Sequence, residues 1–295
     1  MQANVISIIL NIIRPLFLLN GILLYLLGVG MARYYGINPN WKLVILGQLW
    51  LLALQLAGLF LSAYFNMRSS STPEKDKENL PVRISRPANL LIAYAFLAAA
   101  ASLSVLLIRM VATPAVFLLM SLLACGALCY PVPPIRLEYS GYGELVLSLL
   151  IANLTPALGY LLQGGDSLRL LAMVTFPLTM LHLAMLLVFS LSSYAGDLKY
   201  ERRTLMIRMG WQNGMLLHNI LILGSYLLFL LAITYGLPWR IGVPALLTLP
   251  IGILQIWTVN RIAAGATPQW KLLKIMAVAL FGITAYLSAF SFWIR

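Results

Sequence analysis

Two stripes of small polar side chains are the residues of this sequence whose types and spacing could support chemistry. They are Ser62, Asn66 and Ser70 in the first stripe, and Ser190, Ser193 and Asp197 in the second. The first set recurs every four residues and the second at intervals of three and four, so each set lies on one face of a helix. Their oxygen atoms could bind a cation or a polar headgroup, or the small residues could only allow close helix packing in lipid. The spacing leaves both possibilities open.

A basic segment follows each stripe, and another segment with an arginine and several tyrosines lies between them. These segments read "KDKENLPVRISR", "DLKYERRTLMIRMG" and "CYPVPPIRLEYSGYGELV". Their candidates for binding a phosphate, a diphosphate or another anion are Arg83, Arg136, Lys199, Arg202 and Arg203. Arg and Lys bind such groups through charge-assisted hydrogen bonds. The same side chains could instead contact anionic lipid headgroups at a membrane surface.

The composition places these segments in a membrane protein. Hydrophobic residues make up 61% of the chain and charged residues 9%, whereas soluble domains carry about 25% charge. Nine apolar runs approach the length of about 20 residues that a helix needs to cross a bilayer. They lie near residues 8–32, 44–66, 88–109, 113–131, 143–163, 169–193, 215–236, 240–260 and 271–294. None alternates with the two-residue period of a membrane barrel, so we expect an all-α integral membrane protein with nine transmembrane helices in one domain, residues 1–295.

Lys and Arg residues are unequally distributed between the two faces of this expected bundle. If the helices alternate in direction, fourteen of the twenty fall on the face that holds the N-terminus and the loops after the even-numbered runs. The positive-inside rule predicts that this face is cytoplasmic, in a cell inner membrane or an equivalent one. Seven of the eight acidic residues fall on the same face, although acidic residues contribute little to orientation. We therefore predict a site at the cytoplasmic mouth of the bundle, with ordinary solvated loop charge as the alternative.

Five short motifs, in this order along the chain, carry a resemblance to a known family. They are "RP" at Arg14 and Pro15, "SAYFN", "NLPVRIS", "YPVPPIRLEYSGYGEL" and "YAGDLKYERRTLMIRMG". Together they resemble the UbiA superfamily of intramembrane prenyltransferases, and within it the menaquinone, or MenA-like, branch. In that family two aspartate-rich motifs hold Mg²⁺ ions that bind a polyprenyl diphosphate, and the prenyl group is transferred to an aromatic acceptor. The resemblance implies the nine-helix fold of the family and a cavity that is accessible to lipid.

The aspartate-rich motifs are where this sequence departs from the family. Carried over by position, they become Ser62, Ala63, Asn66 and Ser70 in the first motif and Ser190, Ser193 and Asp197 in the second. Only one of these side chains is a carboxylate. Mg²⁺ usually binds one or two carboxylates together with phosphates and water. The degenerate motifs therefore predict poor metal binding, with Asp197 as the remaining candidate ligand.

Neighbouring acidic and histidine side chains do not replace the missing aspartates in the sequence. Glu144 lies at the start of the fifth expected helix, where the helix dipole favours a negative charge. Glu138 lies nearby in the preceding loop, and neither residue restores an aspartate triad. His182 and His218 fall within apolar runs, and without a second His or Cys in register we expect each to be a hydrogen-bonded structural residue.

Two functions are compatible with this sequence. The first is a divergent family member that binds an isoprenoid, quinone or pigment lipid without standard Mg²⁺-dependent catalysis, as a pseudoenzyme or a partner subunit of another membrane protein. The second is an active prenyltransferase that uses Mg²⁺ and transfers a polyprenyl group from its diphosphate to an aromatic acceptor in a menaquinone-type pathway. The missing carboxylates favour the first function. Neither function involves nucleic acid, and no catalytic residue is identified.

Overall fold

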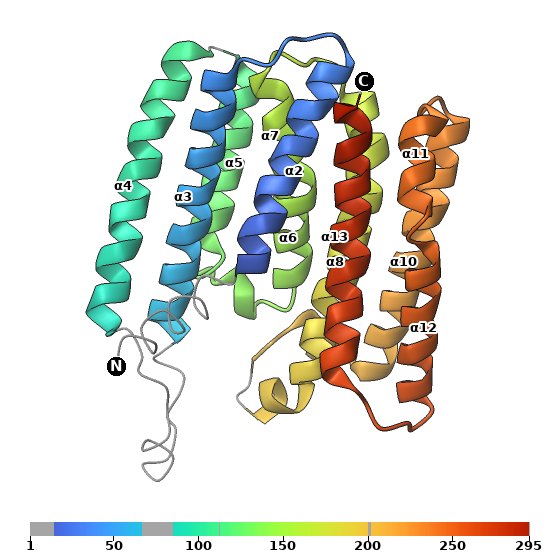
Figure 1. Ribbon diagram of the computed structural model, residues 1–295. Helices are drawn as coiled ribbons and strands as arrows, with labels where there is room; N and C mark the ends of the chain where they lie inside the picture. Colours follow the sequence, from blue (N-terminus) through green and yellow to red (C-terminus); the bar gives the residue numbers. More distant parts are fainter. Residues whose placement is uncertain (1–14, 67–84, 112, 200–201, 295) are drawn as a thin grey trace, which may run out of the picture.

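The computed structural model describes residues 15–66, 85–111, 113–199 and 202–294. Within these ranges the chain consists of helices joined by turns and loops, and it contains no strand. The long helices lie side by side as one bundle (Figure 1). They are α2 (Pro15–Tyr34), α3 (Trp41–Asn66), α4 (Arg86–Met110), α5 (Pro114–Cys129), α8 (Leu168–Lys199), α10 (Trp211–Thr234) and α13 (Trp270–Trp293).

Two further spans are each built from more than one helical element. One contains α6 (Gly143–Ser148), the π-helical segment η3 (Leu149–Leu154) and α7 (Thr155–Leu162), and the other contains α11 (Trp239–Leu246) and α12 (Leu249–Ala263). Pro250 stands in the first turn of α12 after a turn, where a missing backbone N–H does not interrupt the helical hydrogen bonds. Pro156 lies inside the other span, just after the π-helical segment, where the lack of an N–H removes one helical hydrogen bond. Two short elements, η2 (Leu137–Tyr139) and α9 (Leu205–Met209), belong to the loops at one end of the bundle.

The expected membrane fold is confirmed, apart from the number of spans. Eight helical segments of the described chain are long and apolar enough to cross a membrane. The fourth expected run, residues 113–131, corresponds to α5, which is apolar but has 16 residues, fewer than the roughly 20 that a perpendicular span needs. The count of nine transmembrane helices therefore stays a prediction.

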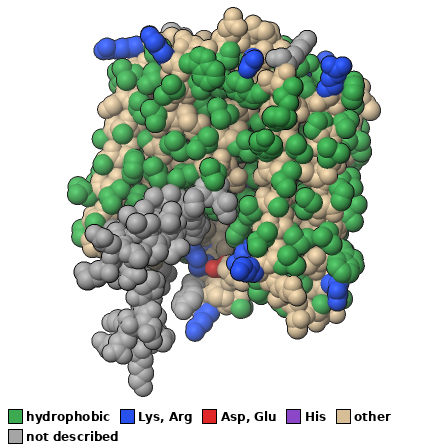
Figure 2. Space-filling view, in the orientation of Figure 1, with side chains coloured by type: hydrophobic (Ala, Val, Ile, Leu, Met, Phe, Trp, Pro, Cys, Tyr) green, Lys and Arg blue, Asp and Glu red, His purple; other side chains and the backbone are tan. Residues whose placement is uncertain are grey.

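Burial distinguishes the central helix of the bundle from its outer ones. In the most apolar 18-residue stretch of α8, 72% of the residues are buried inside the bundle, compared with 17% in the corresponding stretch of α4. Helix α8 packs against α10 and α13, whereas α4 packs mainly against α3. Apolar side chains spread over the visible flank of the molecule, with basic side chains at its two ends (Figure 2). Because α8 is central, a polar stripe on this helix has protein neighbours on several sides.

Helices α2 and α7 cross at very short range. A Cβ atom added at Gly28 would overlap the carbonyl oxygen of Pro156, and one added at Gly159 would overlap that of Tyr25. Glycine at these two positions therefore permits a close backbone approach, as small residues do between membrane helices. This crossing holds in place the span that begins with α6.

The two polar stripes lie at the same end of the bundle. Helices α3 and α8 both end there, at the bottom of Figure 1. The loops that contain η2 and α9 lie at the same end. This end is referred to below as the motif end. The turns at residues 35–40, 163–167 and 235–238 lie at the opposite end. That the motif end faces the cytoplasm stays a prediction from the distribution of charge.

Candidate functional site

The first stripe lies in the last two turns of α3, and its side chains donate hydrogen bonds to a loop carboxylate. Ser62 Oγ donates to Glu138 Oε2 at 2.9 Å. Asn66 Nδ2 lies 3.1 Å from Glu138 Oε1 and 3.3 Å from Oε2, and 3.1 Å from Ser62 Oγ. Ala63 is adjacent on the same helix and supplies no polar side-chain atom. Ser70 and Arg83 lie outside the described residues.

The loop that carries Glu138 is folded back toward α3. Arg136, just before η2, has a φ of 39°, in the left-handed region that is uncommon for residues other than glycine. The backbone N–H of Glu138 donates to the Tyr130 carbonyl oxygen at 3.0 Å, which ties the loop to the end of α5. This geometry directs the Glu138 carboxylate at the first stripe.

Two further loop side chains fix the orientation of the Asn66 amide. Arg136 Nη2 and the Tyr139 hydroxyl donate to Asn66 Oδ1 at 2.9 and 2.7 Å. The Arg136 guanidinium also lies 3.9 Å from the centre of the Tyr139 ring. The amide oxygen therefore accepts two hydrogen bonds while the amide nitrogen donates to Glu138, so both ends of the side chain are satisfied.

The second stripe contacts two different carboxylates. Ser190 Oγ donates to Glu144 Oε1 at 2.7 Å, and Ser193 Oγ donates to Asp197 Oδ2 at 2.6 Å. Glu144 is 9% exposed, and its second oxygen accepts from the backbone N–H of Leu205 at 3.1 Å. Leu205 is the first residue of α9, and Thr204 caps this helix by accepting from the Ile207 N–H at 3.3 Å. Glu144 therefore joins α6, α8 and α9.

Replacing Glu144 by Ala should destabilise the protein. The substitution leaves the Ser190 hydroxyl and the Leu205 N–H without their acceptor in a buried position, which we expect to cost about 2–3 kcal/mol. Glu144→Gln keeps one carbonyl oxygen and should cost less. Thermal unfolding of the purified protein measures both effects, with Asp166→Ala, an exposed carboxylate at the opposite end, as the control. An unchanged Tm for Glu144→Ala would contradict the anchoring role.

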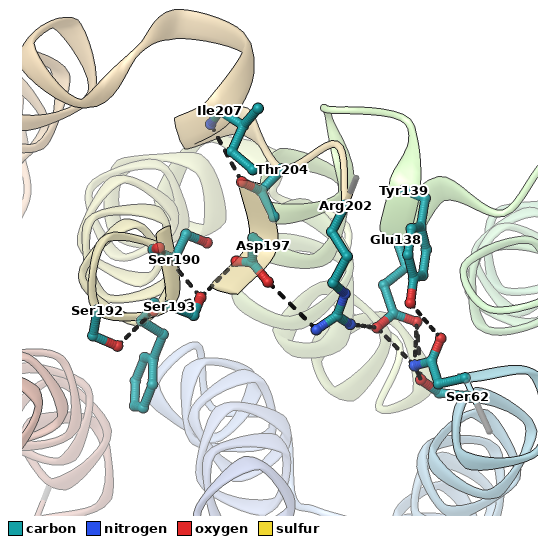
Figure 3. A network of polar contacts seen from close by, with 12 residues as sticks. Ser62, Glu138, Tyr139, Ser190, Ser192, Ser193, Asp197, Arg202, Thr204 and Ile207 are labelled. Carbon is teal, nitrogen blue, oxygen red and sulfur yellow. Dashed lines mark hydrogen bonds and ion pairs between the residues drawn. The ribbon is translucent and has the colours of Figure 1, made fainter. Parts of the chain in front are cut away.

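Arg202 connects the two stripes. Its Nη2 lies 3.1 Å from Glu138 Oε1 and its Nη1 lies 3.6 Å from Asp197 Oδ1. Figure 3 shows the Arg202 side chain between these two carboxylates, with the first stripe beyond Glu138 and Ser193 beyond Asp197. The three residues Glu138, Arg202 and Asp197 are referred to below as the Arg202 bridge.

The environment of Arg202 keeps its side chain charged. Burial acts to lower the pKa of the guanidinium, but the neighbouring Tyr139, Glu138 and Asp197 outweigh burial and raise this pKa above its ordinary value. The Arg202 bridge therefore contains a permanent cation between two carboxylates.

The structure brings together part of the set that the sequence predicts. Arg136 and Arg202 join Ser62, Asn66 and Asp197 in one connected network. Lys199 and Arg203 are exposed at the same end. Three further residues of the site were not among the site residues predicted from the sequence, namely Glu138, Tyr139 and Glu144. The segment "IRLEYSGYGEL" marked their loop through its arginine and tyrosines, but it gave no indication that its two glutamates would each accept from one stripe.

The two histidines have the hydrogen-bonded surroundings that their positions suggest. His182 Nδ1 lies 3.0 Å from Ser148 Oγ in the core. His218 lies 3.1 Å from Asn219 Oδ1 and 2.9 Å from the Gln255 amide. These three contacts join neighbouring helices or residues, whereas the buried Nε2 atom of His182 has no hydrogen-bond partner.

The fold and the site define an intramembrane helical bundle with a connected polar network at one end. The family model described as the UbiA prenyltransferase family matches residues 22–281. The chain therefore belongs to the UbiA prenyltransferase family. A search of curated protein sequences gives no match.

Several solved structures share this fold. A UbiA homologue from Archaeoglobus fulgidus bound to DMAPP and Mg²⁺ is 17% identical, with a TM-score of 0.67 over 95% of this chain and 98% of that chain. The apo structure of a UbiA homologue from Aeropyrum pernix K1 is 17% identical, with a TM-score of 0.66 over 90% and 94% of the two chains. A structure of digeranylgeranylglyceryl phosphate synthase is 14% identical, with a TM-score of 0.64 over 98% and 97%. At these identities the likeness establishes the fold.

The described residues at the motif end do not fit the Mg²⁺ ion that the family implies. Mg²⁺ requires oxygen ligands in near-octahedral geometry and usually one or two carboxylates. Here both Glu138 oxygens accept from side chains of the first stripe or from Arg202, and both Asp197 oxygens face Ser193 or Arg202. In the described part of the chain, no three His, Cys, Asp or Glu side chains form a group that could hold a metal. Each of the four carboxylate oxygens thus already faces a donor group or the guanidinium, with which a cation would have to compete.

Proposed function

We propose that this chain is a UbiA-family membrane protein that binds an isoprenoid, quinone or pigment lipid without standard Mg²⁺-dependent prenyl transfer. The observation that carries this proposal is the Arg202 bridge, in which Glu138 and Asp197, two of the three carboxylates that accept from the stripes, are paired with a cation of the protein itself. Carboxylates that are neutralised in this way are poor ligands for a second, divalent cation, since that cation would have to displace Arg202.

The ligand class follows from the membrane setting and from the remaining polar groups. An isoprenoid tail is apolar and suits a bundle with an apolar interior and flank. Homologues with this fold have been solved bound to GPP and Mg²⁺ and to DMAPP and Mg²⁺, which supports an isoprenoid as the ligand. The predicted anion-binding residues at this end, Lys199 and Arg203 among them, are exposed and could contact a polar or anionic headgroup. Such a lipid-binding protein could serve as a partner subunit of another membrane protein.

The second candidate function is active prenyl transfer to an aromatic acceptor. Asp197 favours it, because this residue retains a carboxylate at a family motif position and lies at the motif end. In such a reaction the bond between the prenyl carbon and the diphosphate oxygen breaks, and its electron pair leaves with the diphosphate. A ring carbon of the acceptor then bonds to the prenyl carbon and releases the proton or carboxyl group that it carried. For that function Mg²⁺ would have to compete with Arg202 for Asp197 and Glu138.

Lipid analysis and a turnover assay distinguish the two functions. The protein is purified in the presence of EDTA, and its bound lipids are extracted and identified by mass spectrometry. It is then incubated with labelled polyprenyl diphosphates, a panel of aromatic acceptors and Mg²⁺. We expect an isoprenoid, quinone or pigment lipid to co-purify at stoichiometric levels and no diphosphate to be released. Mg²⁺-dependent diphosphate release that Asp197→Asn abolishes, and that Asp166→Asn preserves, would overturn the proposal.

A further inference from the structure

The Arg202 guanidinium has the position and the charge of a bridging cation. It lies between carboxylates from two separate elements, at 3.1 Å from Glu138 Oε1 and 3.6 Å from Asp197 Oδ1. The Asp197 and Glu138 side chains are 7% and 16% exposed, so their charges are partly removed from water and need a nearby counterion. A divalent cation between two carboxylates would meet the same need.

The backbone around Arg202 holds this side chain in place. The Arg202 N–H donates to the Asp197 carbonyl oxygen at 2.9 Å, and the Thr204 N–H donates to the Arg202 carbonyl oxygen at 3.1 Å. One residue further, the Leu205 N–H is bound to Glu144. The guanidinium also lies 5.1 Å from the centre of the Tyr139 ring. Contacts on both sides of Arg202 therefore restrict its movement away from the two carboxylates.

Among the described residues, the formal charges of the side chains joined through the Arg202 bridge and Asn66 sum to zero without a metal. Arg202 and Arg136 supply two positive charges, and Glu138 and Asp197 supply two negative charges. A divalent cation added to this network would create a net charge of two in a partly buried position. It would also lie within a few ångströms of the guanidinium, and like charges at that range repel strongly.

We propose that Arg202 is a tethered substitute for a divalent cation and is the residue that excludes metal from the space between Glu138 and Asp197. The inference deepens the proposed metal-independent function and rests on it, but it concerns one residue and has its own test. Without the guanidinium, Ser62 and Asn66 would still donate to Glu138, and Ser193 would still donate to Asp197. The inference predicts, however, that the carboxylate oxygens Glu138 Oε1 and Asp197 Oδ1 would then lack their counterion and accept a divalent cation. Those groups are the hard oxygen ligands that Mn²⁺ and Mg²⁺ prefer.

Mn²⁺ binding to Arg202→Met tests this proposal. Methionine replaces the stem of arginine as far as about the Nε atom and has no charge. The purified wild-type and variant proteins are stripped with EDTA, dialysed and titrated with Mn²⁺, and bound Mn²⁺ is followed by electron paramagnetic resonance. We expect no saturable binding to the wild type and one bound Mn²⁺ in Arg202→Met, with an affinity on the order of tenfold or more above any wild-type binding. Arg261→Met, at an exposed arginine in the last turn of α12 that has no part in the proposed site, is the control and should behave as the wild type.

One additional variant and one additional measurement keep the outcome decisive. Arg202→Met combined with Asp197→Asn should lose the gained Mn²⁺ site, because one of its two carboxylates is then neutral. If Arg202→Met is less stable than the wild type, Mn²⁺ should raise the Tm of the variant and leave that of the wild type unchanged. A variant that binds Mn²⁺ no better than the wild type and gains no stability from Mn²⁺ would overturn the role of Arg202. Mg²⁺-dependent turnover by the wild type would instead overturn the proposed function, so the two failures are distinguishable.

Discussion

Asn66→Asp should cause a large loss of stability despite being almost isosteric. In the wild type the Asn66 amide nitrogen lies 3.1 and 3.3 Å from the two oxygens of Glu138. In the variant an oxygen replaces this nitrogen, so two carboxylates face each other at hydrogen-bond distance. Arg136 and Tyr139 can still donate to the other oxygen. We expect a loss of about 2–3 kcal/mol in the free energy of unfolding, because a donor is lost and a like charge is gained.

The loss in Asn66→Asp should depend on pH. Two carboxylates in contact raise the pKa of one of them in the folded state, because a shared proton relieves their repulsion. The folded variant then binds more protons than the unfolded chain, so its stability should decrease as pH rises through that raised pKa and recover at acidic pH. Chemical unfolding at several pH values measures this difference between the variant and the wild type.

A second substitution provides the control for Asn66→Asp. Adding Glu138→Gln exchanges donor and acceptor, so that the new amide can donate to the new carboxylate, and this should recover part of the lost stability. Asn38→Asp, at an exposed turn of the opposite end, should change stability little. A variant Asn66→Asp that is as stable as the wild type at alkaline pH would show that Asn66 and Glu138 are not in contact.

Glu138→Ala should cause the other large loss of stability. The substitution removes the acceptor of Ser62, Asn66 and Arg202 at once, and it leaves one side of the guanidinium without a counterion. Breaking a fully buried pair costs 3–5 kcal/mol, but the Arg202 side chain is 38% exposed, so water and salt will screen part of this effect. We expect a loss of about 2–3 kcal/mol in the free energy of unfolding.

A double-mutant cycle separates the ion pair from the other contacts of Glu138. Glu138→Ala, Arg202→Met and the double variant are unfolded under identical conditions, and we expect a coupling energy of about 1 kcal/mol that decreases with added salt. The remainder of the Glu138→Ala effect should persist in the Arg202→Met background, because it comes from Ser62 and Asn66. Additive effects of the two substitutions would show that the bridge contributes no pairwise energy.

The fold and the stripe positions could be predicted because both depend on local sequence pattern. Apolar runs of sufficient length specify membrane helices, and a spacing of three or four residues puts side chains on one helix face whatever the rest of the chain does. Ser62 and Asn66 therefore lie together near the end of α3, as their spacing indicates. The count of spans was harder to predict, since α5 is shorter than a typical span.

The partners of the stripes could not be predicted, because they depend on distant segments. Ser62 and Glu138 are 76 residues apart in sequence, and Glu144 meets Leu205 across 61 residues. The turn that directs Glu138 places Arg136 in the left-handed region, although no glycine marks that position. Arg202 was predicted as a ligand for an anion, and the structure pairs it with two carboxylates of the protein. The sequence shows which residues carry a charge, but it does not show which charged residues form ion pairs with one another.

The contact between the first stripe and Glu138 also limits the order in which this sequence could change. An acidic residue introduced at position 62 or 66 meets the Glu138 carboxylate before any metal is bound. Each such step taken alone lowers stability, and Arg202 still opposes a divalent cation after it. Substitutions at Glu138 and Arg202 would therefore have to precede those that restore an aspartate-rich motif. To build a metal site here, Glu138 and Arg202 should be replaced before aspartates are introduced at positions 62 and 66. In the reverse order, each intermediate variant is expected to be less stable than the starting protein.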